Sequence, residues 1–153
     1  MTENLDQYEL PQEYASLPLG EFAFPGELRD QLVSAILAGE KTTTSCLHFE
    51  YEFYGEEMPR IGDREVVIDS DGRPVAVIEM TEVRVVPLGE VDRQHAVDEG
   101  EGYRTVEEWR RGHEDFWHSA EYREAIGQPD FVIDDSMPMV AKRFRLVEDL
   151  RKA

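Results

Sequence analysis

The stretch that decides the fold is Ile36-Leu37-Ala38-Gly39-Glu40-Lys41-Thr42-Thr43-Thr44, where helix-favouring residues give way to β-branched ones. Before Gly39, apolar residues recur with the period of a helix, and glycine commonly follows a helix end. After Gly39, threonines and then nearly alternating apolar and aromatic residues favour a strand. The sequence therefore predicts a helix over Glu27–Ala38 and a strand over Thr42–Tyr54.

The segments downstream supply further strands and helices. Two β-prone runs, Glu65–Asp69 and Val75–Val86, flank an Asp-Gly pair at Asp71-Gly72 and predict a hairpin. A short helix is expected within Glu90–Gly100, and the last strand over Met137–Val147.

A longer helix is expected to begin at Thr105, because Thr105-Val106-Glu107-Glu108 fits a capping box. Hairpins with helices gathered at one side predict an α+β fold. We expect a small, mostly antiparallel β-barrel with helices packed outside, because a closed sheet has no exposed edges.

Size and charge exclude several classes of protein. The 153 residues fit one domain, which we expect over residues 25–150, behind an acidic N-terminal arm over residues 1–24. A net charge of -18 disfavours duplex DNA and anionic membranes as partners. The single Cys46 cannot form an internal disulfide, and no basic leader or long apolar run is present, so we expect a cytoplasmic protein.

Lys41 is unusual in a chain that contains 13 arginines and only three lysines. A desolvated lysine can give up its proton, which arginine cannot. Lys41 precedes three threonines, a serine and Cys46, a combination that permits an activated nucleophile. The alternative is a solvated lysine beside a β-prone run.

The segment from His95 to Gly102 contains Glu99-Gly100-Glu101-Gly102, whose glycines allow a loop to approach a ligand closely. The alternative is a simple connection. His95, His113 and His118 have acidic neighbours, but the i, i+5 spacing of His113 and His118 splays them around a helix. We therefore predict neither a metal nor a cofactor, and motifs for phosphate and dinucleotide binding are absent.

Three other features allow two interpretations each. Cys46 could pair with His48 as a nucleophile, although a buried apolar role is more typical of a lone cysteine in a strand. Trp109 and its aromatic neighbours could stack on bases, but their helical spacing favours the core. The cationic run Lys142-Arg143-Phe144-Arg145 could border a polynucleotide or protect a strand edge.

The order of these features over Glu27–Val147 resembles the ASCH domain family, whose fold is similar to that of PUA RNA-binding domains. The resemblance is strongest at Gly39-x-Lys41-x-x-Thr44 and at Glu99-Gly100. The other matching segments are Pro59-Arg60-Ile61-Gly62-Asp63, Pro74–Val83, His95-Ala96, Trp109 with His113 and Phe116, and Val140–Val147.

The resemblance implies a barrel with a cleft beside the first helix that binds RNA or a nucleobase. One branch of the family is similar to amidohydrolases that deacetylate N4-acetylcytidine with Lys, Thr and Glu, roles that fall on Lys41, Thr44 and Glu99. A neutral Lys41 would take the Thr44 proton, and Glu99 would orient the amine or pass a proton to the leaving base. That branch has an arginine where this chain has Cys46.

We further expect five residues to contribute to substrate binding: Thr42, Thr43, Cys46, Gly100 and Trp109. The predicted partner is a nucleoside or an RNA with a modified base. A noncatalytic RNA-binding module and a ribonuclease that uses the same cleft remain the alternative functions.

Overall fold

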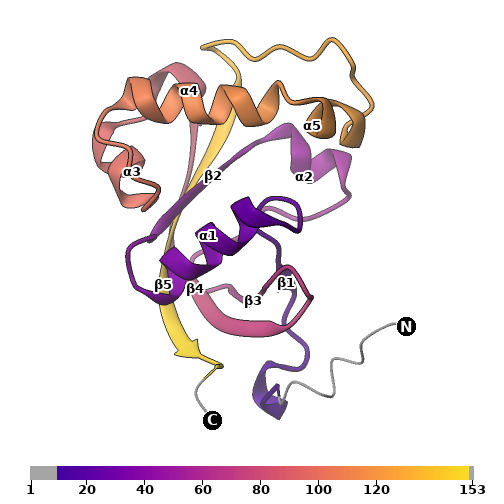
Figure 1. Cartoon of the computed structure of the whole chain (residues 1–153), viewed down its shortest axis with the longest axis vertical. Helices are drawn as coiled ribbons and strands as arrows, with labels where there is room; N and C mark the ends of the chain where they lie inside the picture. Colours follow the sequence, from indigo (N-terminus) through magenta and orange to yellow (C-terminus); the bar gives the residue numbers. More distant parts are fainter. Residues whose placement is uncertain (1–9, 152–153) are drawn as a thin grey trace.

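The computed structural model describes residues 10–151 as one sheet surrounded by short helices (Figure 1). The strands are β1 (Leu19–Gly20), β2 (Thr43–Leu47), β3 (Arg64–Ile68), β4 (Pro74–Pro87) and β5 (Pro138–Asp149). The α-helices are α1 (Glu27–Leu37), α2 (Phe49–Phe53), α3 (Arg93–Asp98), α4 (Val106–Trp117) and α5 (Ala120–Ala125), with 3₁₀ turns η2 (Gln12–Tyr14) and η3 (Leu88–Glu90).

The sheet has the strand order β1-β3-β4-β5-β2 and is antiparallel except for the short parallel pair of β1 and β3. The predicted α+β class is therefore confirmed. Among the described residues, no pairing joins the edge strands β1 and β2, so the sheet stays open where we expected closure. One reason is that β1 contributes only two residues to the sheet.

Both faces of the sheet are covered. Leu32 and Ile36 of α1 pack on one face, against residues of β3, β4 and β5. Tyr14, in the segment before β1, packs on the opposite side of β3 and β4 with Val66 and Val77. The expected arm thus contributes to the packing from residue 10 onwards, and residues 1–9 lie outside the described part of the chain. No helix within residues 10–151 is long and apolar enough to cross a membrane.

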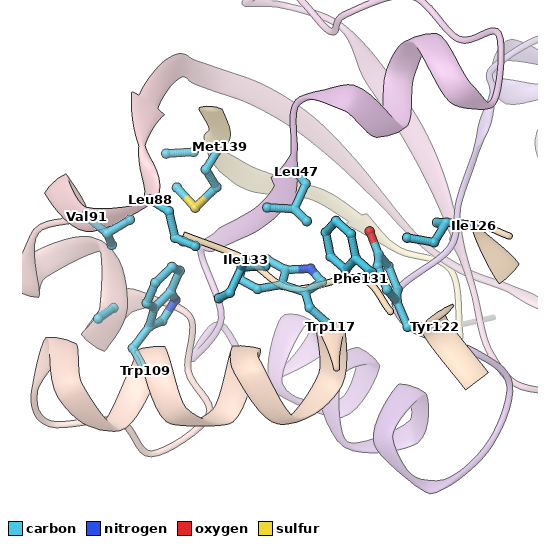
Figure 2. Packing of buried hydrophobic residues seen from close by; sticks show 12 residues of the cluster. Leu47, Leu88, Val91, Trp109, Trp117, Tyr122, Ile126, Phe131, Ile133 and Met139 are labelled. Carbon is cyan, nitrogen blue, oxygen red and sulfur yellow. The ribbon is translucent and has the colours of Figure 1, made fainter. Parts of the chain in front are cut away.

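A second core joins α4 and α5 to β2 and β5 (Figure 2). In Figure 2, Trp109 points from α4 toward Leu88 and Val91, Trp117 lies below Leu47 of β2, and Tyr122 of α5 lies beside Phe131. The indoles of Trp109 and Trp117 are 0% and 2% exposed, which confirms the prediction that helical spacing directs them to the core.

Most predicted elements are confirmed. The first helix and the Asp71-Gly72 hairpin lie where the patterns indicated, and Thr105 caps α4 by accepting a hydrogen bond from the Glu108 amide at 3.1 Å. α5 was not predicted, although Ser119 caps it in the same way by accepting from the Tyr122 amide.

The strand predicted over Thr42–Tyr54 is wrong beyond Leu47, because Phe49–Phe53 forms α2. Strand β5 begins at Pro138, and the last register pair joins Leu47 to Met139. β5 extends only one residue past that pair, to Pro138, whose carbonyl oxygen accepts a hydrogen bond from the His48 amide at 3.0 Å. Alternation of aromatic residues alone therefore does not maintain the strand. The Glu50 carboxylate accepts a hydrogen bond from the Leu47 amide at the junction.

Candidate functional site

A cavity of about 570 Å³ lies between the two edge strands of the open sheet. Gly20 of β1 and residues 44–46 of β2 both line it, together with the N-terminal part of α1, residues from the loop before α4 and α4 itself. The cavity therefore lies where the sheet fails to close between β1 and β2.

Lys41 is buried at the edge of this cavity, with an exposed fraction of 2%. Its ammonium donates hydrogen bonds to the carbonyl oxygens of Thr43 at 2.8 Å and Glu99 at 3.3 Å. Glu101 Oε2 lies 3.7 Å from the same nitrogen. The expected meeting of Lys41 with the Glu99 loop is thus present, and the alternative of a solvated lysine is wrong.

Gly100 makes this approach possible. It has a φ of 70°, and a Cβ atom there would lie 2.5 Å from the Glu40 carbonyl oxygen. Only a residue without a side chain allows the loop to contact the backbone that precedes β2 so closely. Gly100 therefore positions the loop and does not itself line the cavity.

The Glu99 carboxylate is 1% exposed and surrounded by donors. Trp109 Nε1 donates to Oε2 at 2.7 Å and Ser45 Oγ at 2.6 Å, while His95 Nε2 lies 3.2 Å away. His113 Nε2 lies 3.1 Å from Oε1. Burial alone would raise the pKa of Glu99, but the neighbouring cations and these hydrogen bonds hold it well below its usual range.

His113 forms the other half of this interaction. Burial would lower the pKa of the imidazole, but the Glu99 carboxylate beside it raises that pKa above its ordinary value. Its Nδ1 atom lies 2.9 Å from the Trp109 carbonyl oxygen, which fixes the ring. The Glu99 carboxylate therefore favours the protonated form of His113, and the two side chains lie 3.1 Å apart.

Glu101 differs from Glu99. Its carboxyl group lines the cavity, and burial together with the nearby Glu99 charge raises its pKa to about 7, despite the opposing effect of Lys41. A carboxyl group with this pKa can both accept and donate a proton near neutral pH. Sequence reasoning missed it, although it lies in the singled-out loop.

Carboxylate and imidazole atoms of Glu99, Glu101 and His113 lie within 4.8 Å of one another, a set that could hold a metal ion. The Lys41 ammonium, 3.7 Å from Glu101, places a positive charge beside that position and would repel a cation. His118 is not part of the set, because its Nε2 atom accepts a hydrogen bond from the Ile133 amide.

The hydroxyls of Thr44 and Ser45 lie on opposite sides of β2, yet both residues line the cavity. Ser45 Oγ lies 2.7 Å from His95 Nε2 as well as 2.6 Å from Glu99. Within residues 10–151, no hydrogen bond joins Thr44 Oγ1 to Lys41 Nζ. Ser45 was not singled out by sequence reasoning.

Three residues expected at the substrate lie behind the cavity wall. The hydroxyl of Thr43 donates to the His95 carbonyl oxygen at 2.8 Å, and that of Thr42 faces the Asp98 carbonyl oxygen at 3.5 Å. Trp109 is fully buried and acts on the cavity through its hydrogen bond to Glu99.

Cys46 lines the cavity, and its thiol donates to Tyr51 Oη at 3.3 Å. Burial raises the pKa of this thiol, which opposes a nucleophilic role. His48 is exposed at the start of α2, so the Cys46–His48 pair considered from the sequence does not form. The Lys142 ammonium reaches the same Tyr51 oxygen at 3.1 Å.

The cationic run on β5 does not present a continuous basic surface. Arg143 lies 2.9 Å from an Asp98 carboxylate oxygen, and Arg145 bonds to Glu79 at 3.0 Å. Phe144 is buried in the core against α1. These arginines are therefore already paired with carboxylates.

The geometry can be compared with known proteins. A profile of the ASCH domain family matches residues 21–148. The chain belongs to the ASCH domain family. ASCH domains are an RNA-binding PUA-like fold, and the open sheet with its surrounding helices is this protein's version of it.

Two solved structures are similar to this chain in fold. An ASCH domain from Lactobacillus crispatus is 27% identical over 94% of this chain and 91% of its own, with a TM-score of 0.70. A protein from Enterococcus faecalis is 22% identical over 95% of this chain and 84% of its own, with a TM-score of 0.72. A search of functionally curated proteins gave no significant match.

Proposed function

We propose that this ASCH protein is an amidohydrolase that removes an acyl group from the exocyclic nitrogen of a modified nucleobase or nucleoside. The observation that carries the proposal is the meeting of a buried ammonium, Lys41, with the Glu101 carboxyl group of pKa about 7 in a cavity lined by hydroxyls. This combination supplies a positive charge, a proton carrier and a nucleophile.

The reaction divides among three side chains. Thr44 Oγ attacks the acyl carbon while its proton passes to the Glu101 carboxylate, and Lys41 stabilises the negative charge that develops on the acyl oxygen. The carbon–nitrogen bond then breaks as Glu101 returns the proton to the departing nitrogen. Water then attacks the Thr44 ester and passes a proton to Glu101, and Glu101 returns this proton to Thr44 Oγ as the carbon–oxygen bond breaks and the acid is released.

Proton transfer by Glu101, and not Glu99, follows from the hydrogen bonds of the two carboxylates. Four side chains that can donate already surround the Glu99 oxygens, and its lowered pKa makes it a poor base. In this proposal Glu99 holds Ser45, His95 and His113 in place. Glu101 faces the cavity and titrates in the range that general acid–base catalysis needs.

RNA that carries a modified base is a second candidate ligand, because ASCH domains are RNA-binding. In that case the cavity would receive one unpaired base, either as a binding module or as a ribonuclease. The pairing of Arg143 and Arg145 with carboxylates leaves little free positive charge on β5 for the phosphate backbone, which favours the small ligand.

The test is release of cytidine from N4-acetylcytidine by the purified protein, measured chromatographically. We expect Lys41→Met and Glu101→Gln each to lower kcat by at least about 100-fold, the usual range for an electrostatic or acid–base group. Glu107→Gln, an exposed carboxylate on α4, is the matched control. Absence of cytidine, or full activity of Lys41→Met, would contradict the proposal, and cleavage of single-stranded RNA instead would support the ribonuclease.

A further inference from the structure

A second polar cluster lies in the same cavity, formed by Cys46, Tyr51, Glu65 and Lys142. These residues come from β2, α2, β3 and β5 and are separate from the cluster around Glu99. The proposed reaction uses none of them. Their contacts leave hydrogen-bonding groups free to meet a ligand.

Lys142 differs from the arginines that follow it on β5. Within residues 10–151, no carboxylate oxygen lies within ion-pair distance of its ammonium, whereas Arg143 and Arg145 both have such partners. The ammonium contacts the Tyr51 hydroxyl at 3.1 Å and lies 5.7 Å from the centroid of the same ring. An ammonium has three N–H donors, so two are left to point elsewhere.

Tyr51 and Glu65 complete the set. Tyr51 Oη accepts from Lys142 at 3.1 Å and lies 3.3 Å from the Cys46 sulfur, and both residues line the cavity beside Tyr51. Within residues 10–151, the Glu65 carboxylate accepts no hydrogen bond. Its side chain packs against Gly20 of β1, where a Cβ atom would lie 2.9 Å from Glu65 Oε2. The cluster therefore offers both donors and an acceptor to the cavity.

The charges of the cluster favour a neutral ligand. Burial would lower the pKa of Lys142, but Cys46, Tyr51 and Glu65 together raise it, so the ammonium persists at neutral pH. Burial raises the pKa of the Glu65 carboxyl group, which lines the same space, and the Lys142 charge opposes that rise. A buried polar group without a hydrogen bond costs free energy, and a ligand whose polar atoms bond to it offsets that cost.

We propose that Lys142, Tyr51 and Glu65 form a recognition subsite for the polar edge of an uncharged nucleobase. Lys142 and Tyr51 donate to a carbonyl oxygen or ring nitrogen of the base, and Glu65 accepts from an N–H group. This assignment rests on the proposed function, because it places the base at one end of the cavity and the scissile acyl group at the other.

The test is equilibrium binding of cytosine and cytidine, measured by calorimetry. Lys142→Met should weaken both ligands by about tenfold or more, the usual effect of losing a hydrogen bond to a charged group. Tyr51→Phe, which removes only one oxygen, should weaken both by about fivefold and keeps the subsite testable where Lys142→Met does not fold. Arg145→Met removes a positive charge from the same strand outside the cavity and serves as the control.

The outcomes separate this inference from the proposed function. Binding that depends on Lys142 in a protein that releases no cytidine from N4-acetylcytidine would support the subsite and refute the amidohydrolase. In an active protein, Lys142→Met should raise KM about tenfold with kcat within about twofold. Two results would refute the subsite: a wild-type protein that binds neither ligand, or equal affinities of Lys142→Met and Arg145→Met. Weaker binding of cytidine but not of cytosine by Lys142→Met would also refute it, because that result indicates a contact with the sugar.

Discussion

Substitution of Glu101 by glutamine should change how the stability of the protein depends on pH. The pKa of Glu101 is about 7 in the folded protein against an ordinary value of 4.5, so between these pH values the folded state binds more protons than the unfolded state. The contribution of Glu101 to stability is therefore fully present below pH 4.5 and is lost as the pH rises through 7. A pKa difference of this size corresponds to about 3 kcal/mol.

The assay is urea unfolding followed by circular dichroism at a series of pH values from 4.5 to 8.5. Glutamine mimics the protonated carboxyl group and does not titrate, so the stability of Glu101→Gln relative to wild type should rise by about 3 kcal/mol across this range. Glu107→Gln measures the effect of losing any one carboxylate from the acidic surface. If the difference in stability between Glu101→Gln and wild type stays constant with pH, the raised pKa of a buried Glu101 is refuted.

Three further predictions concern the loop, the buried carboxylate and the ligand. Gly100→Ala should destabilise the protein by about 3–5 kcal/mol in thermal unfolding, because the new Cβ would collide with the Glu40 carbonyl oxygen. Gly102→Ala is the control: it has open space around it and should cost only about 1 kcal/mol, because of its positive φ. Trp109→Phe should cost about 2 kcal/mol more than Trp117→Phe in urea unfolding, because only the Trp109 indole donates to the buried carboxylate in the described structure. Binding of cytidine should be nearly independent of salt from 50 to 500 mM, and a steep loss of affinity would instead indicate contacts with a phosphate backbone.

The predictable part of the fold is the part that local rules govern. The helix before Gly39, the Asp71-Gly72 hairpin and the Thr105 cap each depend on residues close together in sequence, and all three form as expected. The length of β2 depends on where β5 begins, which no pattern within Thr42–Tyr54 reveals. The aromatic alternation there was therefore misinterpreted as a strand.

The site was predictable to a similar extent. Lys41 could be found because lysine is rare in this chain, and the Glu99 loop because of its glycines. The roles of Glu101, Ser45 and Lys142 could not be predicted from the sequence. Carboxylates are abundant in it, and the partners of these three side chains come from elements distant along the chain.

The most direct test of the account is the pH dependence of cytidine release from N4-acetylcytidine by the wild-type protein. If Glu101 accepts the proton of the nucleophile, kcat/KM should rise with pH, with an inflection near pH 7, and then level off. The inflection should be absent from the residual activity of Glu101→Gln. A rate that does not change between pH 5 and 8, or an inflection near 7 that survives in Glu101→Gln, would contradict the assignment of proton transfer to this carboxyl group.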